Sequence, residues 1–502
     1  MIVCHFLNQL AFKEILTKRL LTRPLCISLL FCLVTSVAPA NFFQTGFVQI
    51  VSSQSASDDA LASARRLDSV DRNARGGFSQ LPAAENLRRG NIYLSNRAFT
   101  EAREHFQTIV QSNPNDVNVP AALFGIGRSF FVPRRYAESL PFFERLARDY
   151  SFTKEGREGL YALATAFLRM SRADEAVERY IEYTRKFPQG ERAEASYLNV
   201  IDGLREAGRN SEAIDWIART RQKFPGTATD TNALFARLRL EISESDWSHA
   251  IESAGELRGI AFQTGVVTSA DEVAYLRAYA LERAGRSSEA INAYLSIPDS
   301  VESYYGALAT KHLTALSAAR QRSDVAARIS RVNSQIASSS QLYPVPYREM
   351  LLRATRASRL DPRLVLSIMR RESNFRPSAK SPAGARGLLQ LTIDQALKYA
   401  TQAGIQNLRE DDLYNPDTSI RIGSAYLSEL TKLFTDSLEA VAASYNGGED
   451  NVARWLKRAH QQDAGVFVAD IGFPETKTYV FKILANYRAY KLLYTEDLRR
   501  SS

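Results

Sequence analysis

Six alanines recur at nearly constant spacing along the first part of the chain. Each follows a polar residue and precedes apolar residues at helical spacing, within residues 89–313. The successive separations are 35, 39, 37, 37 and 40 residues for Ala102, Ala137, Ala176, Ala213, Ala250 and Ala290. A small residue at a fixed helix position lets paired helices approach closely, and a period in the high thirties is typical of stacked hairpins. The pattern therefore predicts an all-α solenoid over residues 89–313.

This segment resembles tetratricopeptide-like repeats, with a looser spacing than the regular repeat of about 34 residues. Two roles remain open for such an array. One role is to bind a protein partner in the concave face of the array, and the other is to shape and position an attached domain.

The composition changes on both sides of the repeats. Residues 41–88 are rich in Ser, Ala and Asp, which predicts a poorly ordered or loosely docked lead-in. Residues 314–342 are rich in Ser, Arg and Ala without a clear apolar face, and we interpret them as a linker. From residue 343 the chain consists of helical runs broken by Pro and Gly, with almost no strand-like alternation. Residues 343–495 are therefore predicted to form a second, all-α domain of ordinary size.

Residues 1–40 have the three parts of a secretory signal peptide. Basic residues precede an apolar run over 25–34, and a small-residue site follows at Ala38-Pro39-Ala40. The run is too short to span a bilayer comfortably, although an uncleaved membrane anchor is the alternative. We therefore expect export to the periplasm or cell envelope, with no stable membrane span once the leader is removed.

The cysteines and histidines restrict the possible chemistry. All three cysteines, Cys4, Cys26 and Cys32, lie in the leader, so the mature chain has no thiol nucleophile or Cys-based zinc site. His460 is the only histidine beyond residue 312, which leaves a serine–histidine triad in the second domain almost no base. The net charge is +9, and residues 341–502 contain 23 basic and 18 acidic residues. This excess suits a nucleic acid, an anionic membrane, an acidic glycan, or simply a solvated surface.

Glu372 stands at the end of a short predicted helix. Asp361 is a suitable N-cap, followed by proline at the first helical position. Pro377 prevents continuation, so Glu372 falls in or just after the last turn. An apolar stripe is formed by Leu364, Val365, Ile368 and Met369. The negative end of the helix dipole raises the pKa of a carboxyl group there, as a general acid requires. The alternative is a solvated ion pair with Arg370 or Arg371.

Three later segments suggest a binding surface. Small residues and turn formers over 381–387 precede Gln390, whose amide can bind sugar hydroxyls or an N-acetyl group. A predicted helix over 438–445 ends at Tyr445 and Asn446, where a flat ring and a hydroxyl suit a pyranose. Glu475 and Tyr479 lie one helical turn apart, on the same face. Each segment alone is equally well explained as an ordinary loop, a capped helix or a surface charge pair.

Taken in order, these segments resemble the catalytic domain of the soluble lytic transglycosylases, which is related to goose-type lysozyme. The matching segments are Glu372-Ser373, residues 384–390, residues 444–448 and residues 475–480. Residues 303–309 are similar to the junction in the large members, where helical repeats precede the catalytic domain. The chain departs from the family at Leu389, where methionine is usual, at Ser444, where alanine is usual, and over residues 392–396.

The resemblance implies a peptidoglycan lytic transglycosylase. Such an enzyme cleaves the β-1,4 bond between N-acetylmuramic acid and N-acetylglucosamine without water and leaves 1,6-anhydromuramoyl ends. Glu372 is implied to act as acid and then as base, and the substrate N-acetyl group stabilises the oxocarbenium-like centre. The substrate-binding residues implied by the resemblance are Ser373, Leu389, Gln390, Tyr445, Asn446, Glu475 and Tyr479. Peptidoglycan strands are the expected partner; no metal, cofactor or nucleic acid is expected.

Two other functions remain open from the sequence. A muramidase would use the same Glu372 but add water and leave reducing ends. A non-catalytic scaffold would bind peptidoglycan while its helical repeats bind a partner.

Overall fold

The computed structural model describes residues 59–72, 76–78, 80–316, 322–356, 359–460 and 463–501. The predicted leader lies outside these residues. Within them the chain is helical, without named strands, and its only β-type pairings are isolated bridges such as that between Lys380 and Arg386. The prediction of an all-α fold is therefore confirmed.

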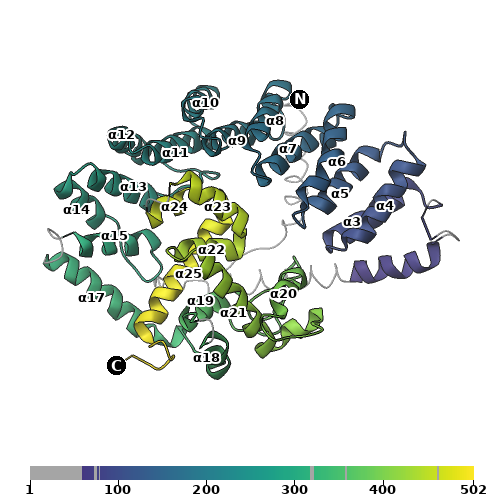
Figure 1. Cartoon of the computed structure of the whole chain (residues 1–502). Coiled ribbons are helices and arrows are strands. Elements are labelled where there is room, and N and C mark those ends of the chain that lie inside the picture. Colours follow the sequence, from purple (N-terminus) through teal and green to yellow (C-terminus); the bar gives the residue numbers. More distant parts are fainter. Residues whose placement is uncertain are drawn as a thin grey trace, which may run out of the picture. The chain divides into compact units, whose positions relative to one another are not determined.

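The repeat region consists of antiparallel helices, each of which packs against the next from α3 to α15 (Figure 1). Polar turns separate them, and several contain a residue with positive φ, such as Gly208 at 72°. The helices are α3 (Ala83–Ser95), α4 (Phe99–Ser112), α5 (Val119–Phe131), α6 (Tyr136–Asp149), α7 (Lys154–Arg169), α8 (Ala173–Lys186), α9 (Ala193–Glu206), α10 (Asn210–Lys223), α11 (Ala228–Ser243), α12 (Trp247–Arg258), α13 (Ala270–Arg283), α14 (Ser287–Leu295) and α15 (Tyr304–Ala315).

Five of the six repeat alanines are fully buried where paired helices meet, namely Ala102, Ala176, Ala213, Ala250 and Ala290. Ala137 is the exception because it is exposed. Ser139, two residues later in α6, is fully buried in its place. With Ser139 in the series, the separations become 37, 37, 37, 37 and 40 residues. The repeat is thus more regular than the alanines alone predict, because serine is also small enough for the contact.

The predicted linker over 314–342 contains a helix, α17 (Ser323–Ser338), followed by the short 3₁₀ helix η1 (Ser340–Leu342). The prediction that this segment lacks an apolar face is wrong, because Val325, Val332 and Ile336 are buried on one side of α17. Arg328 lies on the same side and donates to the hydroxyl oxygen of Thr310 over 2.6 Å. A buried arginine in the stripe conceals its amphipathic character in the sequence.

The C-terminal part of the predicted lead-in is helical and docked, so poor order is wrong for this part. Residues 59–71 are helical, and Asp68 in this helix is buried. Its carboxylate accepts hydrogen bonds from Arg89 over 2.7 Å and from Tyr93 over 2.5 Å, and it contacts His105 over 3.1 Å. These polar contacts to α3 and α4 dock the segment on the first repeat.

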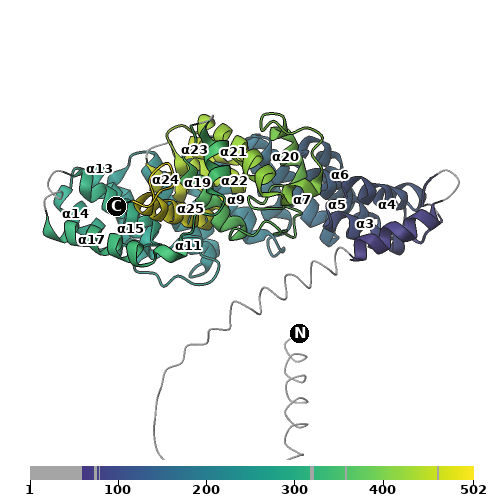
Figure 2. The same ribbon diagram turned by 90° about the horizontal axis from the view of Figure 1, so that it is seen from below.

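The second part of the chain is a compact set of helices beside the repeats (Figure 1). Its elements are α18 (Arg348–Arg356), α19 (Pro362–Ser373), α20 (Ile393–Ala400), η2 (Glu410–Tyr414), α21 (Pro416–Leu433), α22 (Leu438–Gly447), α23 (Glu449–Arg458), α24 (Ala464–Ala469) and α25 (Pro474–Leu493). Helix α25 packs against α19 and α22, and also against α15, α17 and α24 (Figure 2). It therefore links the second part to the end of the repeats.

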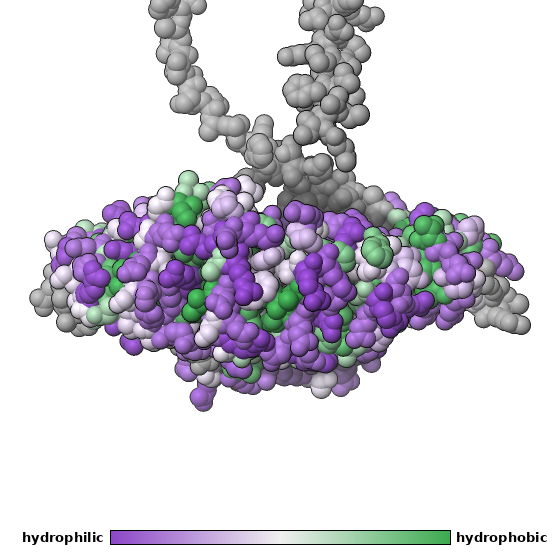
Figure 3. All heavy atoms as spheres, turned by 90° about the horizontal axis from the view of Figure 1, so that it is seen from above, coloured by the Kyte–Doolittle hydropathy of each residue, from purple (hydrophilic) through white to green (hydrophobic). Residues whose placement is uncertain are grey.

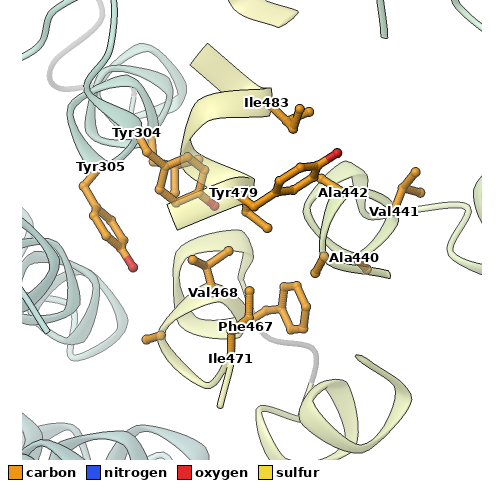
Figure 4. Packing of buried hydrophobic residues seen from close by; sticks show 14 of the residues in the cluster. Tyr304, Tyr305, Ala440, Val441, Ala442, Phe467, Val468, Ile471, Tyr479 and Ile483 are labelled. Atoms are coloured by element: carbon orange, nitrogen blue, oxygen red, sulfur yellow. The ribbon is translucent and has the colours of Figure 1, made fainter. Parts of the chain in front are cut away.

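The hydrophobic core is continuous across this junction. Tyr304 and Tyr305 of α15 belong to the same buried cluster as Tyr479 and Ile483 of α25 and Phe467 of α24 (Figure 4). The ring of Tyr304 stacks on that of Phe481 at a centroid distance of 5.0 Å. We propose that residues 343–495 form the functional domain, with the late repeats built into its core.

The protein face drawn in Figure 3 is mostly hydrophilic, and its apolar residues form small separate groups. Among the helices of the described ranges, none has both the length and the hydropathy needed to cross a membrane.

Candidate active site around Glu372

Helix α19 forms as its sequence predicts. The side chain of Asp361 caps it by accepting from the backbone N–H of Arg363, and Pro362 occupies the first turn. The helix ends at Asn374, whose φ of 47° and ψ of 43° are left-handed. Its apolar face is fully buried, so Glu372 is held in the last turn of a helix that is fixed by the core.

The carboxyl group of Glu372 meets Tyr479 of α25. The tyrosine hydroxyl donates to Oε1 of Glu372 over 2.7 Å, and Tyr479 itself is buried. Burial raises the pKa of Glu372 to about 7. The hydrogen bond from Tyr479 and the positive charge of Arg371 oppose this rise, whereas the charge of Glu475 adds to it. The direction of the sequence prediction holds, but burial rather than the helix dipole is the main cause.

The segment between Ala379 and Leu391 folds back against the end of α19. Ser373 donates its hydroxyl to the backbone oxygen of Leu388 over 2.8 Å, which joins the helix end to this loop. Gly387 has a φ of 76°, and a Cβ there would lie 1.9 Å from the backbone oxygen of Leu413. Only glycine fits at this position. Ser373 is thus buried and holds the loop rather than facing solvent.

The two neighbouring residues of the loop have different surroundings. The side chain of Leu389 is fully buried and packs against Gly423 of α21, so it supports the loop, whereas the resemblance implies that it binds the substrate. Gln390 is partly exposed and left-handed, with a φ of 48°. Its amide nitrogen donates to the backbone oxygens of Ala379 and Gly387 over 3.0 and 2.9 Å. The donor side of Gln390 is therefore used within the loop.

Helix α22 brings Tyr445 and Asn446 to the same region. The hydroxyl of Tyr445 donates to the backbone oxygen of Leu389 over 2.7 Å, and its ring lies 5.2 Å from that of Tyr426. Tyr445 is partly exposed and Asn446 is exposed. The charge of Glu372 contributes to the raised pKa of Tyr445, after burial, so the two side chains share one electrostatic environment.

Thr476 is a residue that the sequence reasoning missed. Its hydroxyl donates to Oδ1 of Asn446 over 2.6 Å and so fixes the orientation of that amide. The available signal was its place between Glu475 and Tyr479. Glu475 is exposed in the first turn of α25 and acts on Glu372 through its charge. The structure therefore groups Glu372, Tyr445, Asn446, Glu475 and Tyr479 and uses Ser373 and Leu389 to support them.

Comparisons with known proteins match both parts of the chain. Residues 349–468 match the family described as Transglycosylase SLT domain. Residues 87–152 and 161–228 match the Tetratricopeptide repeat family. The matched SLT segment includes α19, the Gly387 loop and α22, whereas Glu475 and Tyr479 follow its end.

Curated relatives match the second part of the chain. A soluble lytic murein transglycosylase from Salmonella typhimurium is 35% identical over 150 residues, which are 30% of this chain and 23% of the relative. The Escherichia coli K12 protein of the same description is 33% identical over 159 residues, or 31% of this chain and 24% of the relative. The matched regions thus span about a quarter of these relatives.

Solved structures of lytic transglycosylases are also similar. The Slt protein from Pseudomonas aeruginosa aligns with a TM-score of 0.46 and 20% identity, over 90% of this chain and 79% of that chain. The 70 kDa enzyme from Escherichia coli aligns with a TM-score of 0.41 and 18% identity, over 84% of this chain and 76% of that chain.

Proposed function

We propose that this chain, a member of the soluble lytic transglycosylase family, is an exported enzyme that cuts peptidoglycan strands without consuming water. The bond cut is the β-1,4 linkage between N-acetylmuramic acid and N-acetylglucosamine. The observation that carries the proposal is the partly buried carboxyl group of Glu372, which has a pKa of about 7 and accepts a hydrogen bond from Tyr479. A carboxyl group with this pKa is partly protonated at neutral pH and serves as an acid or a base.

In the first step, protonated Glu372 donates its proton to the glycosidic oxygen as the bond from the muramoyl C1 to that oxygen breaks. The N-acetylglucosamine side leaves with a new 4-hydroxyl group, and the substrate N-acetyl group stabilises the positive charge at C1. The ionised carboxylate of Glu372 then accepts the proton of the muramoyl 6-hydroxyl. The 6-oxygen bonds to C1, which closes the anhydro ring and returns Glu372 to its protonated form. One bond breaks, one forms, and no water is used.

The surrounding residues support each stage. The hydroxyl of Tyr479 stabilises the ionised form of Glu372 between the two proton transfers, because a hydrogen bond to a carboxylate lowers its pKa. Partly exposed Tyr445 and the amide of Asn446, held by Thr476, contact the sugar rings. Exposed Glu475 keeps the pKa of Glu372 high through its charge. A single catalytic carboxyl group is sufficient because the substrate provides both the stabilising group and the nucleophile.

The test is digestion of purified peptidoglycan by the full chain and by Glu372→Gln, with the released muropeptides identified by mass. We expect anhydro ends from the wild type, lighter by one water than reducing ends, and their loss in the variant. Glu429→Gln is a matched control, because Glu429 is exposed on α21 of the same domain. Undiminished product from Glu372→Gln would contradict the assigned acid, and reducing ends alone from the wild type would indicate a muramidase.

A further inference from the structure

A cavity of about 600 Å³ lies where the turns after α7 and α9 meet helix α23. We call it the α23 cavity. Its charged lining is mainly basic, with five cationic side chains and two carboxylates. The cationic residues are Arg169, Arg205, Arg454, Lys457 and Arg458, and the acidic residues are Glu206 and Asp450. Small apolar side chains, including Ala173 and Ala453, complete the wall.

Three of these arginines have carboxylate partners in the fold. Arg205 and Arg458 bind Asp470 over 2.8 and 3.2 Å. Arg454 binds Glu206 over 3.0 Å. These pairs are buried or nearly so. Most of the positive charge of the lining is therefore neutralised within the fold, where it belongs to the contact between α9 and α23.

Two cations in the lining lack such a partner. Arg169 and Lys457 form no ion pair with a carboxylate of the described residues. The guanidinium of Arg169 donates to the amide oxygen of Asn451 and lies 4.4 Å from the ring centroid of Phe473. Arg169 and Lys457 therefore present positive charge to the cavity, where an anionic group can accept charged hydrogen bonds.

We propose that the α23 cavity binds the carboxylates of an acidic peptide, such as the peptide carried by the glycan strand. Its volume is larger than a single inorganic anion needs, and its apolar wall accepts small side chains. A carboxylate between Arg169 and Lys457 would supply the counter-charge that neither has within the described part of the fold. The identity of the peptide rests on the proposed function, whereas the anion site rests on the cavity itself.

The α23 cavity is also connected to the candidate active site. Asn451, which accepts from Arg169, donates through its own amide to the backbone oxygen of Gly447 over 2.7 Å. Gly447 ends α22, immediately after Tyr445 and Asn446. A peptide held at Arg169 would therefore fix the end of the helix that contacts the sugar.

Binding is tested by calorimetry on the full chain with Glu372→Gln as the background, so that no cleavage occurs. The probe is N-acetylated alanyl-glutamyl-alanine, which has two carboxylates, and its uncharged diamide is the negative control. Inorganic phosphate is titrated separately. We expect the acidic tripeptide to bind and the diamide not to bind. Arg169→Gln should weaken tripeptide binding about tenfold, the loss that removal of one charged hydrogen-bond donor gives.

Two further variants keep the result interpretable. Lys457→Gln changes an exposed residue at the cavity, and it should also weaken binding even if Arg169→Gln perturbs the fold. Arg135→Gln, an exposed arginine on the repeats, should leave binding unchanged. The proposal is overturned if the tripeptide does not bind, if neither cavity variant weakens it, or if phosphate binds and the tripeptide does not displace it. Because no step depends on catalysis, its failure is distinct from failure of the proposed activity.

Discussion

The hydroxyl of Tyr479 and the carboxyl group of Glu372 form a 2.7 Å hydrogen bond between α25 and α19, across 107 residues of sequence. The bond lowers the pKa of Glu372, while burial raises it to about 7. The balance of these two effects keeps both protonation states accessible near neutral pH, as an acid that later acts as a base requires.

Replacement of Tyr479 by phenylalanine removes the effect that favours the ionised state. We expect the pKa of Glu372 to rise further, so the alkaline limb of the kcat/KM profile moves to higher pH. We also expect kcat to fall about tenfold, because the ionised intermediate state loses a charged hydrogen bond. Initial rates of anhydromuropeptide release across pH 5–9 measure both effects. Tyr399→Phe in α20 is the matched control, and a shift of the limb to lower pH would contradict the assignment.

The position of Glu372 was predictable because its determinants are local. The Asp361 cap, the following proline and the apolar stripe all lie within twelve residues of it. The surroundings of Ser373 and Leu389 were not predictable in this way. Leu389 is buried because Gly423, far along the chain, leaves room for its side chain. A motif alone does not say which of its members faces the ligand and which supports the loop.

In the repeats, too, the local pattern is predictable from the sequence, whereas the contacts between helices are not. Their period follows from small residues at fixed positions, but the choice between Ala137 and Ser139 depends on which side of α6 meets its neighbour. Helix α17 was missed because Arg328 interrupts its apolar stripe. The hydrogen-bond acceptors that make this burial tolerable, Thr310 and Gly306, come from a different helix.

Glu372→Gln should stabilise the protein in a pH-dependent manner. The folded-state pKa of about 7 lies above the ordinary value of 4.5, so folding favours the protonated carboxyl group. The associated stability is present below pH 4.5 and is lost as pH rises to about 7. Glutamine avoids that loss. We expect a gain of about 2 kcal/mol at pH 8, reduced from the full shift because the residue is partly exposed, and little gain at pH 4.5. Unfolding curves of both proteins at the two pH values measure it; equal gains would contradict the raised pKa.

Gly387→Ala should be much more disruptive than Gly384→Ala. Both glycines have a φ of 76° and lie in the same loop. A Cβ at Gly387 would lie 1.9 Å from the backbone oxygen of Leu413, whereas one at Gly384 would have no atom within 4 Å. We expect a loss of about 3 kcal/mol for Gly387→Ala and about 1 kcal/mol for Gly384→Ala, which has only the backbone strain. Activity should fall mainly in Gly387→Ala, because its clash would displace the loop whose backbone oxygens accept hydrogen bonds from Ser373 and Tyr445. Similar melting temperatures for the two variants would contradict this account.

Asp470→Asn tests the contact between the repeats and the second part of the chain. The carboxylate of Asp470 is almost fully buried and binds Arg205 over 2.8 Å, Arg239 over 3.0 Å and Arg458 over 3.2 Å. These arginines hold its pKa well below the ordinary range despite burial.

The neutral amide removes the nearer of the two carboxylates that these buried guanidinium groups share and leaves Asp202, at 3.5–3.7 Å from each, as the other. We therefore expect a loss of about 4 kcal/mol in the free energy of unfolding at pH 7. Asp149→Asn, an exposed aspartate on α6, should have a negligible effect. Thermal unfolding followed by circular dichroism compares the two variants. Helices α9, α11 and α23 meet at Asp470. An early transition confined to this contact would therefore appear as a first step in the melting curve of Asp470→Asn. An unchanged curve would show that the pairing contributes little to stability.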